Sequence, residues 1–450
     1  MIQKKKILKS ILSSISTFDL DNLHHFLFQM QFIIRIHFFK NEIIPHSRKT
    51  QFPLNKCLWG LILFLSLNSC QKHYEFQLIG MPELNSSVTI AQAEITDFDQ
   101  IENYQLMYKG AVLLFQITGN KIYWKVSSEN YKGPFQWMPS NKLPEKNHFF
   151  LTAKKEFGQH SIYLRDQKII GYQMDTIEVP EDVNPAYRRS GFIHPLNTPS
   201  GKRLTQIQPK DHFHHYGLWN PWTHTLFEGD TLDFWNLDKK EGTVRFAEML
   251  SEDTGAIFSE FEVLHQHVVI KEGKNKIALN EKQKIRITPI AGDRFFLDFE
   301  IKYYPHTYSS FKIIEYRYGG FGWRTTEEWD NKNSRVLSSE GKTRKDADGS
   351  LARWCIVDGK LGEGYGGAVM LSHPQNYNHP EPLRIWPEDQ YGRGDLFANF
   401  ATTKNTDWIM VPKTTYTLRY RMLVYDGKIM PEEAENNWVL YTQPLTYQLK

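Results

Sequence analysis

Apolar and polar residues alternate over most of this chain, and Gly, Asn and Pro stand where the alternation breaks. Residues 276–290 (KIALNEKQKIRITPI) and 293–305 (DRFFLDFEIKYYP) are clear examples. A period of two is typical of a β-strand with one buried face. Only residues 431–438 have a pattern that permits a short helix. The sequence therefore predicts an all-β protein.

The predicted strands form two groups of different length. The strands before residue 157 are short, which predicts a small β-sandwich of immunoglobulin-like size over residues 71–157. Over residues 158–450 the strands are longer and more numerous. A single twisted sheet of that size would expose too much apolar surface. We therefore expect a large antiparallel sandwich of two sheets over residues 158–450.

The first 70 residues differ from the rest of the chain. An apolar run between Cys57 and Cys70 follows basic residues and is too short to span a bilayer comfortably. Residues 67–70 (LNSC) have the form of a bacterial lipobox, so we expect residues 54–70 to be a lipoprotein signal peptide with lipidation at Cys70. A membrane anchor or a buried helix is the alternative. Residues 1–53 precede this complete signal without a folded pattern, which indicates an over-extended gene start.

Charge and cysteine content narrow the classes of function. The net charge is +3, and the 54 basic and 51 acidic residues are mixed along the chain. A nucleic-acid-binding protein needs a basic stripe, so no nucleic-acid partner is expected. Processing at Cys70 would leave Cys355 as the only free thiol, and hence no internal disulfide. The expected location is the periplasm or the outer membrane, with a lipid anchor.

The candidate chemistry is concentrated in residues 194–238, where five histidines and three tryptophans occur among turn-forming residues. Such polar, loop-rich segments often carry functional side chains. The run Asp211 to His215 reads DHFHH. If this run is extended, His212 and His214 share one face, and Asp211 and His215 share the other. We expect the floor of a pocket here.

This histidine pair suits two kinds of chemistry. His212 or His214 could act as general acid or base, with Asp211 orienting the imidazole. The pair could instead ligate a metal, with His194, His224 or a carboxylate as the third ligand. A third interpretation is that these histidines only hydrogen-bond a loop together.

Other polar and aromatic residues are candidates for the same pocket. Indole rings offer flat faces that suit the C–H faces of sugars, although each could equally be part of the core. Arg317 could clamp a carboxylate such as that of a uronic acid, or form a surface pair with Glu315. Asp233 or Glu315 is the expected partner carboxylate for catalysis. The expected substrate-binding residues are His194, His215, Trp219, Trp222, Trp235, Arg317, Arg324, Asn376 and His379.

Several separated motifs resemble, in the same order, a bacterial family labelled methane oxygenase PmoA-like. They are HPLNTPSGK (194–202), DHFHHYGLW (211–219), DFW (233–235), YGGFGWR (318–324), HPQNYNHP (373–380) and LRYRMLVYDG (418–427). Tyr216 stands where an arginine is common in the family, and Cys355 stands where a small residue or valine is frequent. The resemblance implies a secreted protein. A true methane monooxygenase subunit has several spanning helices, and this chain has one short apolar run.

The expected architecture is similar to the two-sheet sandwich of galactose mutarotases and related carbohydrate enzymes. The leading hypothesis is therefore an exported lipoprotein enzyme that hydrolyses, eliminates or epimerises a glycan or sugar derivative and requires no cofactor. A non-catalytic glycan-binding lipoprotein is the alternative, and a metal-dependent oxygenase is the third. We expect His194, His212, His214, Arg317 and His379 to converge on one concave surface.

Overall fold

The computed structural model describes residues 74–80, 84, 88–95, 104–140 and 150–450. The predicted signal peptide (54–70), its Cys70 and the extension (1–53) lie outside the described residues. Within the described part, no helix is long and apolar enough to cross a membrane. The strands form four sheets, and every pairing is antiparallel except that of β2 with β29.

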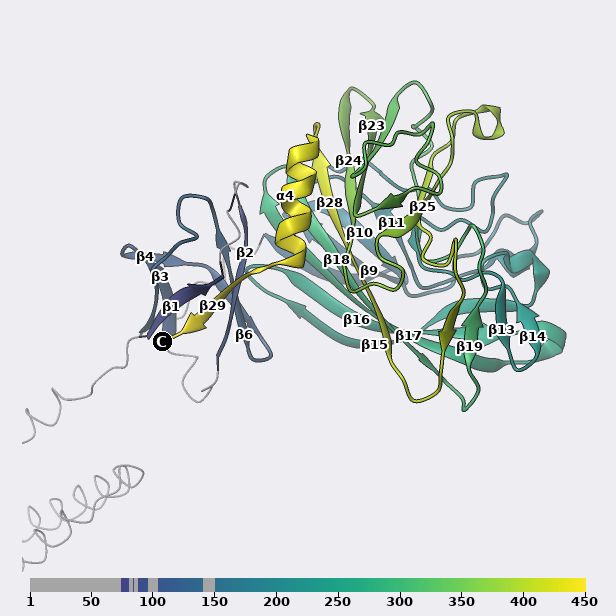
Figure 1. Cartoon of the computed structure of the whole chain (residues 1–450), viewed down its shortest axis with the longest axis horizontal. Helices are drawn as coiled ribbons and strands as arrows, with labels where there is room; N and C mark the ends of the chain where they lie inside the picture. The colour runs from purple at the N-terminus through teal and green to yellow at the C-terminus, as the bar shows by residue number, and fades with distance from the viewer. Residues whose placement is uncertain (1–73, 81–83, 85–87, 96–103, 141–149) are drawn as a thin grey trace, which may run out of the picture. The chain divides into compact units, whose positions relative to one another are not determined.

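The first sheet has eight strands and combines early residues with the C-terminal strand (Figure 1). In spatial order it contains β4 (Ala111–Leu113), β3 (Tyr104–Tyr108), β7 (Phe135–Pro139), β1 (Tyr74–Ile79), β29 (Leu445–Leu449), β2 (Thr89–Glu94), β6 (Lys121–Val126) and β5 (Phe115–Thr118). Phe115 of β5 and Trp137 of β7 are far apart in this order, yet their ring centroids are 5.0 Å apart. The sheet therefore curls around its own core. Leu445 and Tyr447 belong to that core. The small sandwich predicted for residues 71–157 therefore includes a strand from outside that range.

A nine-stranded sheet forms one layer of the large sandwich, which we call the large unit. It contains, in spatial order, β22 (Leu351–Ala352), β25 (Glu381–Ile385), β26 (Phe397–Phe400), β20 (Phe321–Arg324), β12 (Leu218–Trp219), β11 (Phe192–Leu196), β10 (Gln167–Gln173), β9 (Gln159–Leu164) and β8 (Leu151–Glu156).

An eight-stranded sheet forms the other layer. It contains β15 (Gly242–Thr254), β16 (Ser259–Val269), β17 (Lys276–Ala291), β18 (Arg294–Pro305), β28 (Tyr416–Asp426), β24 (Gly364–Ser372), β23 (Trp354–Leu361) and β21 (Ser334–Ser338). One apolar core joins the two layers, with Leu218 and Trp323 from the first and Ile285 and Leu297 from the second. The prediction of an all-β protein with a large two-sheet antiparallel sandwich is confirmed.

The remaining elements are small. A four-stranded sheet contains β14 (Asp230–Leu232), β13 (Thr225–Phe227), β19 (Phe311–Ile313) and β27 (Trp408–Met410). The short 3₁₀ helices of the described residues are η4 (Pro185–Tyr187), η5 (Leu237–Lys239), η6 (Lys271–Gly273) and η7 (Gln390–Gly392).

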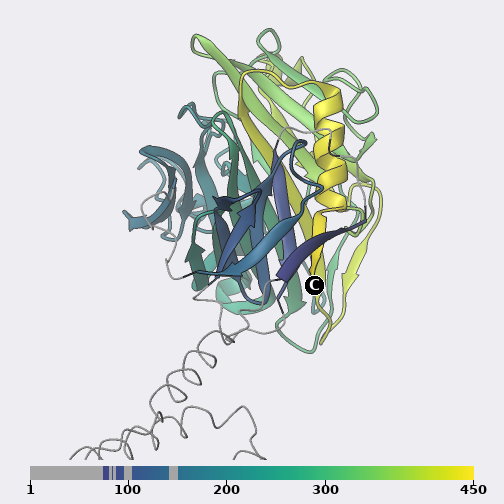
Figure 2. The ribbon, with the colours of Figure 1, turned by 90° about the vertical axis from the view of Figure 1, so that its left-hand side faces the viewer.

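The only α-helix of the described residues is α4 (Pro431–Thr442), which confirms and extends the helix predicted at 431–438. Proline at the start and acidic residues in the first turn both favour a helix N-terminus. Ala434 and Trp438 pack against Ile356 and Leu423, on the outer face of the sheet that contains β23 and β28. Figure 2 shows the yellow helix α4 beside this sheet. The chain then passes from α4 into β29 (Figure 1).

Candidate active site

The histidine-rich run forms turns rather than a strand. The backbone N–H of His212 donates to the carbonyl of Pro209 at 2.8 Å, and that of His215 donates to the carbonyl of His212 at 3.0 Å. The expected extended alternation is therefore wrong, because a proline–aspartate stretch favours turns over a strand. The turns bring the His212 and His215 rings into a stack at 4.9 Å, and His214 lies 5.4 Å and 4.7 Å from them.

These imidazoles lie on the outer face of the nine-stranded sheet. Neighbouring residues of a strand point to opposite faces, so Leu218 enters the sandwich core while Trp219 points away from it. Phe397 of β26 belongs to the same outer cluster as Trp219. The His215 ring lies 5.4 Å from Trp219, 5.3 Å from Phe397 and 5.5 Å from Trp386. The predicted aromatic wall therefore exists, but Trp219 and Trp235 are buried and offer no free ring face.

Both ring nitrogens of His212 form side-chain hydrogen bonds, and these bonds suit proton transfer. Its Nδ1 lies 2.8 Å from Asp211 Oδ2, and its Nε2 lies 3.1 Å from the hydroxyl of Tyr391. The arrangement is satisfied when Nδ1–H donates to Asp211 and Nε2 accepts from Tyr391. Burial lowers the pKa of His212, and Asp211 only partly offsets this effect. The imidazole is therefore neutral near pH 7, with Nε2 as a proton acceptor.

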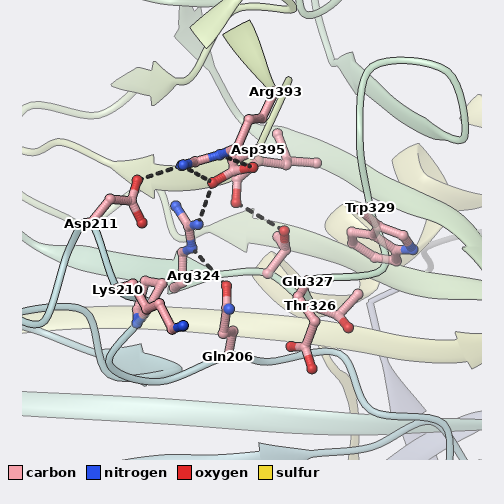
Figure 3. Close-up of a pocket in the computed structure, with 12 residues that line it drawn as sticks. Gln206, Lys210, Asp211, Arg324, Thr326, Glu327, Trp329, Arg393 and Asp395 are labelled. Atoms are coloured by element: carbon pink, nitrogen blue, oxygen red, sulfur yellow. Dashed lines mark hydrogen bonds and ion pairs between the residues drawn. The ribbon is translucent and has the colours of Figure 1, made fainter. Parts of the chain in front are cut away.

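A polar cavity of about 250 Å³ is lined by Asp211, the partner of His212, although His212 itself is not part of the lining (Figure 3). The Arg393 guanidinium donates to Asp211 and, at 2.7 Å, to Asp395. Arg324 donates to Asp395 at 2.7 Å and to Gln206 at 3.3 Å. These contacts fix both guanidinium groups and hold Asp211 in place for His212. The cavity is also lined by Lys210, Thr326, Glu327 and Trp329.

Glu315 and Arg317 do not lie on a strand, because residues 314–320 connect β19 to β20 without regular structure. Both side chains are exposed. The Arg317 guanidinium lies 5.4 Å from the centre of the Tyr318 ring. Tyr318 in turn contacts Trp235, at 5.5 Å between centroids. Arg317 is therefore at the margin of the aromatic cluster.

Several predicted site residues lie elsewhere. Trp222 is part of the sandwich core against Tyr303. The His194 ring bonds to the Thr205 hydroxyl at 2.9 Å. Asn376 and His379 belong to a separate loop, where Ser372 contacts both. The structure thus brings together His212, His214, His215, Trp219, Trp235 and Arg324, with Arg317 at the margin, but neither His194 nor His379 joins them.

In the described part of the chain, no three His, Cys, Asp or Glu side chains are arranged so that they could hold a metal ion. His194, the expected third ligand of His212 and His214, is bonded to Thr205 instead. Cys355 is buried in β23, and burial raises the pKa of its thiol to about 12. A thiol with that pKa is unreactive at neutral pH.

Asp233 is buried and has its oxygens occupied. It accepts hydrogen bonds from the backbone N–H groups of Trp235 and Asn236, from the Thr223 hydroxyl and from Lys239, all at 2.8–2.9 Å. Burial alone would raise the pKa of Asp233, but these donors hold it below its usual value. This geometry suits a carboxylate that stabilises a loop.

We expect Asp233→Ala to lower the free energy of unfolding by about 3 kcal/mol, because buried donors lose their acceptor. Urea denaturation of the purified variant measures this change. Substitution of the exposed Asp238 by alanine is the matched control, and equal stability of the two variants would contradict the structural role.

Sequence reasoning missed Trp386, Tyr391, Arg393 and Asp395. All four come from the segment 386–395 (WPEDQYGRGD), which joins β25 to β26. Its mixture of Pro, Gly, charged and aromatic residues is the same signal that marked the histidine-rich run, and it could have been found on that ground.

The sequence model of a family of unknown function (DUF6807) matches residues 159–439, more than half of the chain. The chain belongs to this family. The family description assigns no activity and gives no support to the methane oxygenase label. No curated protein matches the chain.

Solved structures show partial likeness at low identity. A heparan sulfate lyase HepC mutant from Pedobacter heparinus has a TM-score of 0.30 and 9% identity over 65% of this chain, which spans only 38% of the lyase. A putative mutarotase (YeaD) from Salmonella typhimurium has a TM-score of 0.32 and 9% identity, covering 62% of this chain and 94% of its own. A galactose 1-epimerase from Lactobacillus acidophilus has a TM-score of 0.27 and 9% identity, covering 64% of this chain and 98% of its own.

Proposed function

We propose that this protein is an enzyme that moves a proton on a sugar or glycan, in an elimination or an epimerisation. The observation that carries the proposal is the hydrogen bond of 2.8 Å between Asp211 and His212, beside a polar cavity. A carboxylate on one imidazole nitrogen orients the ring and stabilises the imidazolium that forms when the other nitrogen accepts a proton.

The arrangement favours proton transfer over hydrolysis by a pair of carboxylates. Glycoside hydrolysis of the usual kind needs two carboxyl groups on opposite sides of the bond that breaks. Asp233 is occupied by loop contacts and Glu315 is exposed on a different segment. Asp233 is therefore occupied and Glu315 is not paired with His212, whereas the neutral imidazole of His212 can accept a proton once the Tyr391 hydroxyl is displaced.

The cavity suits a substrate with many hydroxyl groups. Its lining alternates acceptors, such as Asp395 and Glu327, with donors, such as Arg324 and Lys210. A hydroxyl group donates and accepts at once, so several adjacent hydroxyls can be satisfied by such a mixed lining. Tyr391 is exposed and covers His212 Nε2, so a substrate hydroxyl or C–H group reaches this atom by displacing the tyrosine hydroxyl.

The proposal includes export and lipidation at Cys70. Support comes from the apolar run and the lipobox-like LNSC of residues 67–70. An enzyme held at the cell surface meets polymeric glycans directly. Radiolabelled palmitate incorporation in a bacterial host, lost in Cys70→Ala, tests this part.

We expect wild-type protein to convert at least one member of a panel of plant and algal polysaccharides and their oligosaccharides. Elimination creates an unsaturated product that absorbs in the ultraviolet, and epimerisation in D₂O introduces deuterium at the reacting carbon. Mass spectrometry and NMR detect both. Glycan binding without product or deuterium incorporation would contradict the proposal and favour a non-catalytic glycan-binding protein.

A further inference from the structure

We propose that Arg317, Arg384 and Lys404 form a site for an anionic group, a carboxylate or sulfate, of the substrate. The inference rests on the proposed function and names the chemical class of glycan. We call these three side chains the basic patch. They come from three separate segments, residues 314–320, β25 and the connection between β26 and β27.

Tyr318 and Asp348 bring the basic patch together. The guanidinium groups of Arg384 and Arg317 lie 4.8 Å and 5.4 Å from the centre of the Tyr318 ring. Arg384 and Lys404 share the carboxylate of Asp348, at 3.1 Å and 2.7 Å. Burial and the nearby charges of Arg384 and Arg317 lower the pKa of Lys404, although Asp348 acts in the opposite direction. The three cations therefore act on one another.

The charges of the basic patch are not balanced. Arg384 and Lys404 share one carboxylate, that of Asp348, and Arg317 forms no ion pair with any described residue. Glu315, two residues before it, is exposed and forms no described ion pair either. An anion that approaches the patch thus meets net positive charge, and guanidinium groups bind carboxylate or sulfate through paired N–H donors.

Arg384 supplies a second, independent observation. Its side chain is only 8% exposed, yet its Nε has no hydrogen-bond partner among the described residues. Buried guanidinium N–H groups are nearly always satisfied, and an exception calls for a ligand or water. Its two other nitrogens donate to Tyr318, at 2.9 Å, and to Asp348 and the Ile385 carbonyl, both at 3.1 Å.

The basic patch is connected to the proton-transfer pair by direct contacts. The Tyr318 hydroxyl also accepts a hydrogen bond of 3.0 Å from Trp386 Nε1. The Trp386 ring lies 5.0 Å from His212 and 5.2 Å from Tyr391. Trp386 thus connects the patch to His212, and in the proposed complex the sugar lies along this ring with its anionic group on the patch.

For a uronic acid this placement has a chemical consequence. His212 Nε2 accepts the proton on the carbon next to the carboxylate, and the C–H electron pair moves into the carboxylate, where nearby cations stabilise it. In an elimination that pair then forms a C=C bond and expels the neighbouring alkoxide, which takes up the proton held by the His212 imidazolium, directly or through water. In an epimerisation the carbon takes a proton from water on its other face, and the imidazolium of His212 returns its proton to water.

We expect Arg317→Gln to raise KM for an acidic glycan by about tenfold or more with a smaller change in kcat, since this residue binds rather than transfers protons. Arg317 is exposed and makes no described hydrogen bond, so the substitution spares the fold. Lys404→Gln is expected to act in the same direction. Lys360→Gln, at an exposed lysine of β23, is the matched control and is expected to leave KM unchanged.

The substrates are oligogalacturonides, a sulfated galactan oligosaccharide, and the oligogalacturonides after reduction of their carboxyl groups. Turnover of the oligogalacturonides alone identifies the anionic group as a carboxylate. Turnover of the sulfated galactan oligosaccharide alone identifies it as a sulfate. Equal turnover of the reduced form, with KM unaffected by Arg317→Gln, would overturn the inference while leaving the proposed function intact.

A second measurement is independent of catalysis. Sulfate that replaces chloride at constant ionic strength is expected to raise the Tm of the wild type and of Lys360→Gln more than that of Arg317→Gln. If no glycan is turned over but this difference is present, the anion site stands without the proposed function. Equal Tm shifts in all three proteins would overturn the proposed anion site.

Discussion

Replacement of His212 by glutamine is expected to lower kcat by about 10²–10⁴-fold on any substrate that the wild type converts, with an unchanged fold. Positioned acid–base groups contribute an acceleration of this size. Glutamine keeps hydrogen-bonding capacity near Asp211 and Tyr391 but cannot accept a proton. Steady-state kinetics measure kcat, and circular dichroism with thermal denaturation checks the fold.

His306→Gln is the matched control, because His306 is exposed in the connection that follows β18 and its imidazole is hydrogen-bonded to Asn280, away from the histidine-rich run. It is expected to retain wild-type kcat. His214→Gln is expected to lose less than His212→Gln, since burial lowers the pKa of His214 to about 4 and no carboxylate of the described residues hydrogen-bonds to its ring. Full kcat in His212→Gln would refute the assignment of the base.

The assignment of His212 as the base also predicts the direction in which the pH profile of kcat/KM shifts. Burial and the charges of Arg324 and Arg393 lower the pKa of His212, while Asp211 raises it. Since the neutral imidazole is the active form, the acid limb of kcat/KM should lie below pH 6.5. Asp211→Asn removes the one group that favours the imidazolium, so it should move this limb to lower pH and also reduce kcat. A limb that moves upward would contradict the pairing of Asp211 with His212.

Alternation alone was sufficient to predict the sandwich. In β17, Ile285 and Ile287 are buried while Lys284 and Arg286 are turned outward, and neighbouring strands repeat this pattern. A period of two fixes which face is buried, so the two large sheets follow from the pattern. It does not fix the partners of short strands. Nothing in LTYQL at 445–449 indicates pairing with β1 and β2 rather than with the strands of the large unit.

The site was only partly predictable for a related reason. The sequence treats Trp219 and Trp222 alike, but strand parity puts Trp219 in the outer cluster and the turn after β12 returns Trp222 to the core. The sequence left His212 and His214 open as partners of Asp211, and the hydrogen bond is to His212, whereas Tyr391 is contributed by a segment 179 residues away. Contacts of this kind depend on which strands become neighbours, which local pattern does not encode.

Removal of the carboxylate of Glu281 is the substitution that we expect to cost the most stability. Glu281 of β17 is buried between the two large sheets and accepts hydrogen bonds from His267, at 2.7 Å, and from Gln283. His265 lies 3.5 Å from it and bonds through its other nitrogen to the Tyr172 hydroxyl of β10, in the opposite sheet. Burial would raise the pKa of Glu281, but the hydrogen bonds from His265 and His267 hold it well below its usual range.

Glu281→Ala leaves these buried donors without an acceptor and opens a polar cavity between the sheets. We therefore expect the free energy of unfolding to fall by about 3–5 kcal/mol, as measured by urea denaturation. Lys282→Ala is the matched control, because the next residue of β17 points to the opposite face and should change stability little. Glu281→Gln keeps an acceptor and should lose less than Glu281→Ala. Near-wild-type stability of Glu281→Ala would mean that the network does not hold the two sheets together, and that the apolar core alone determines their packing.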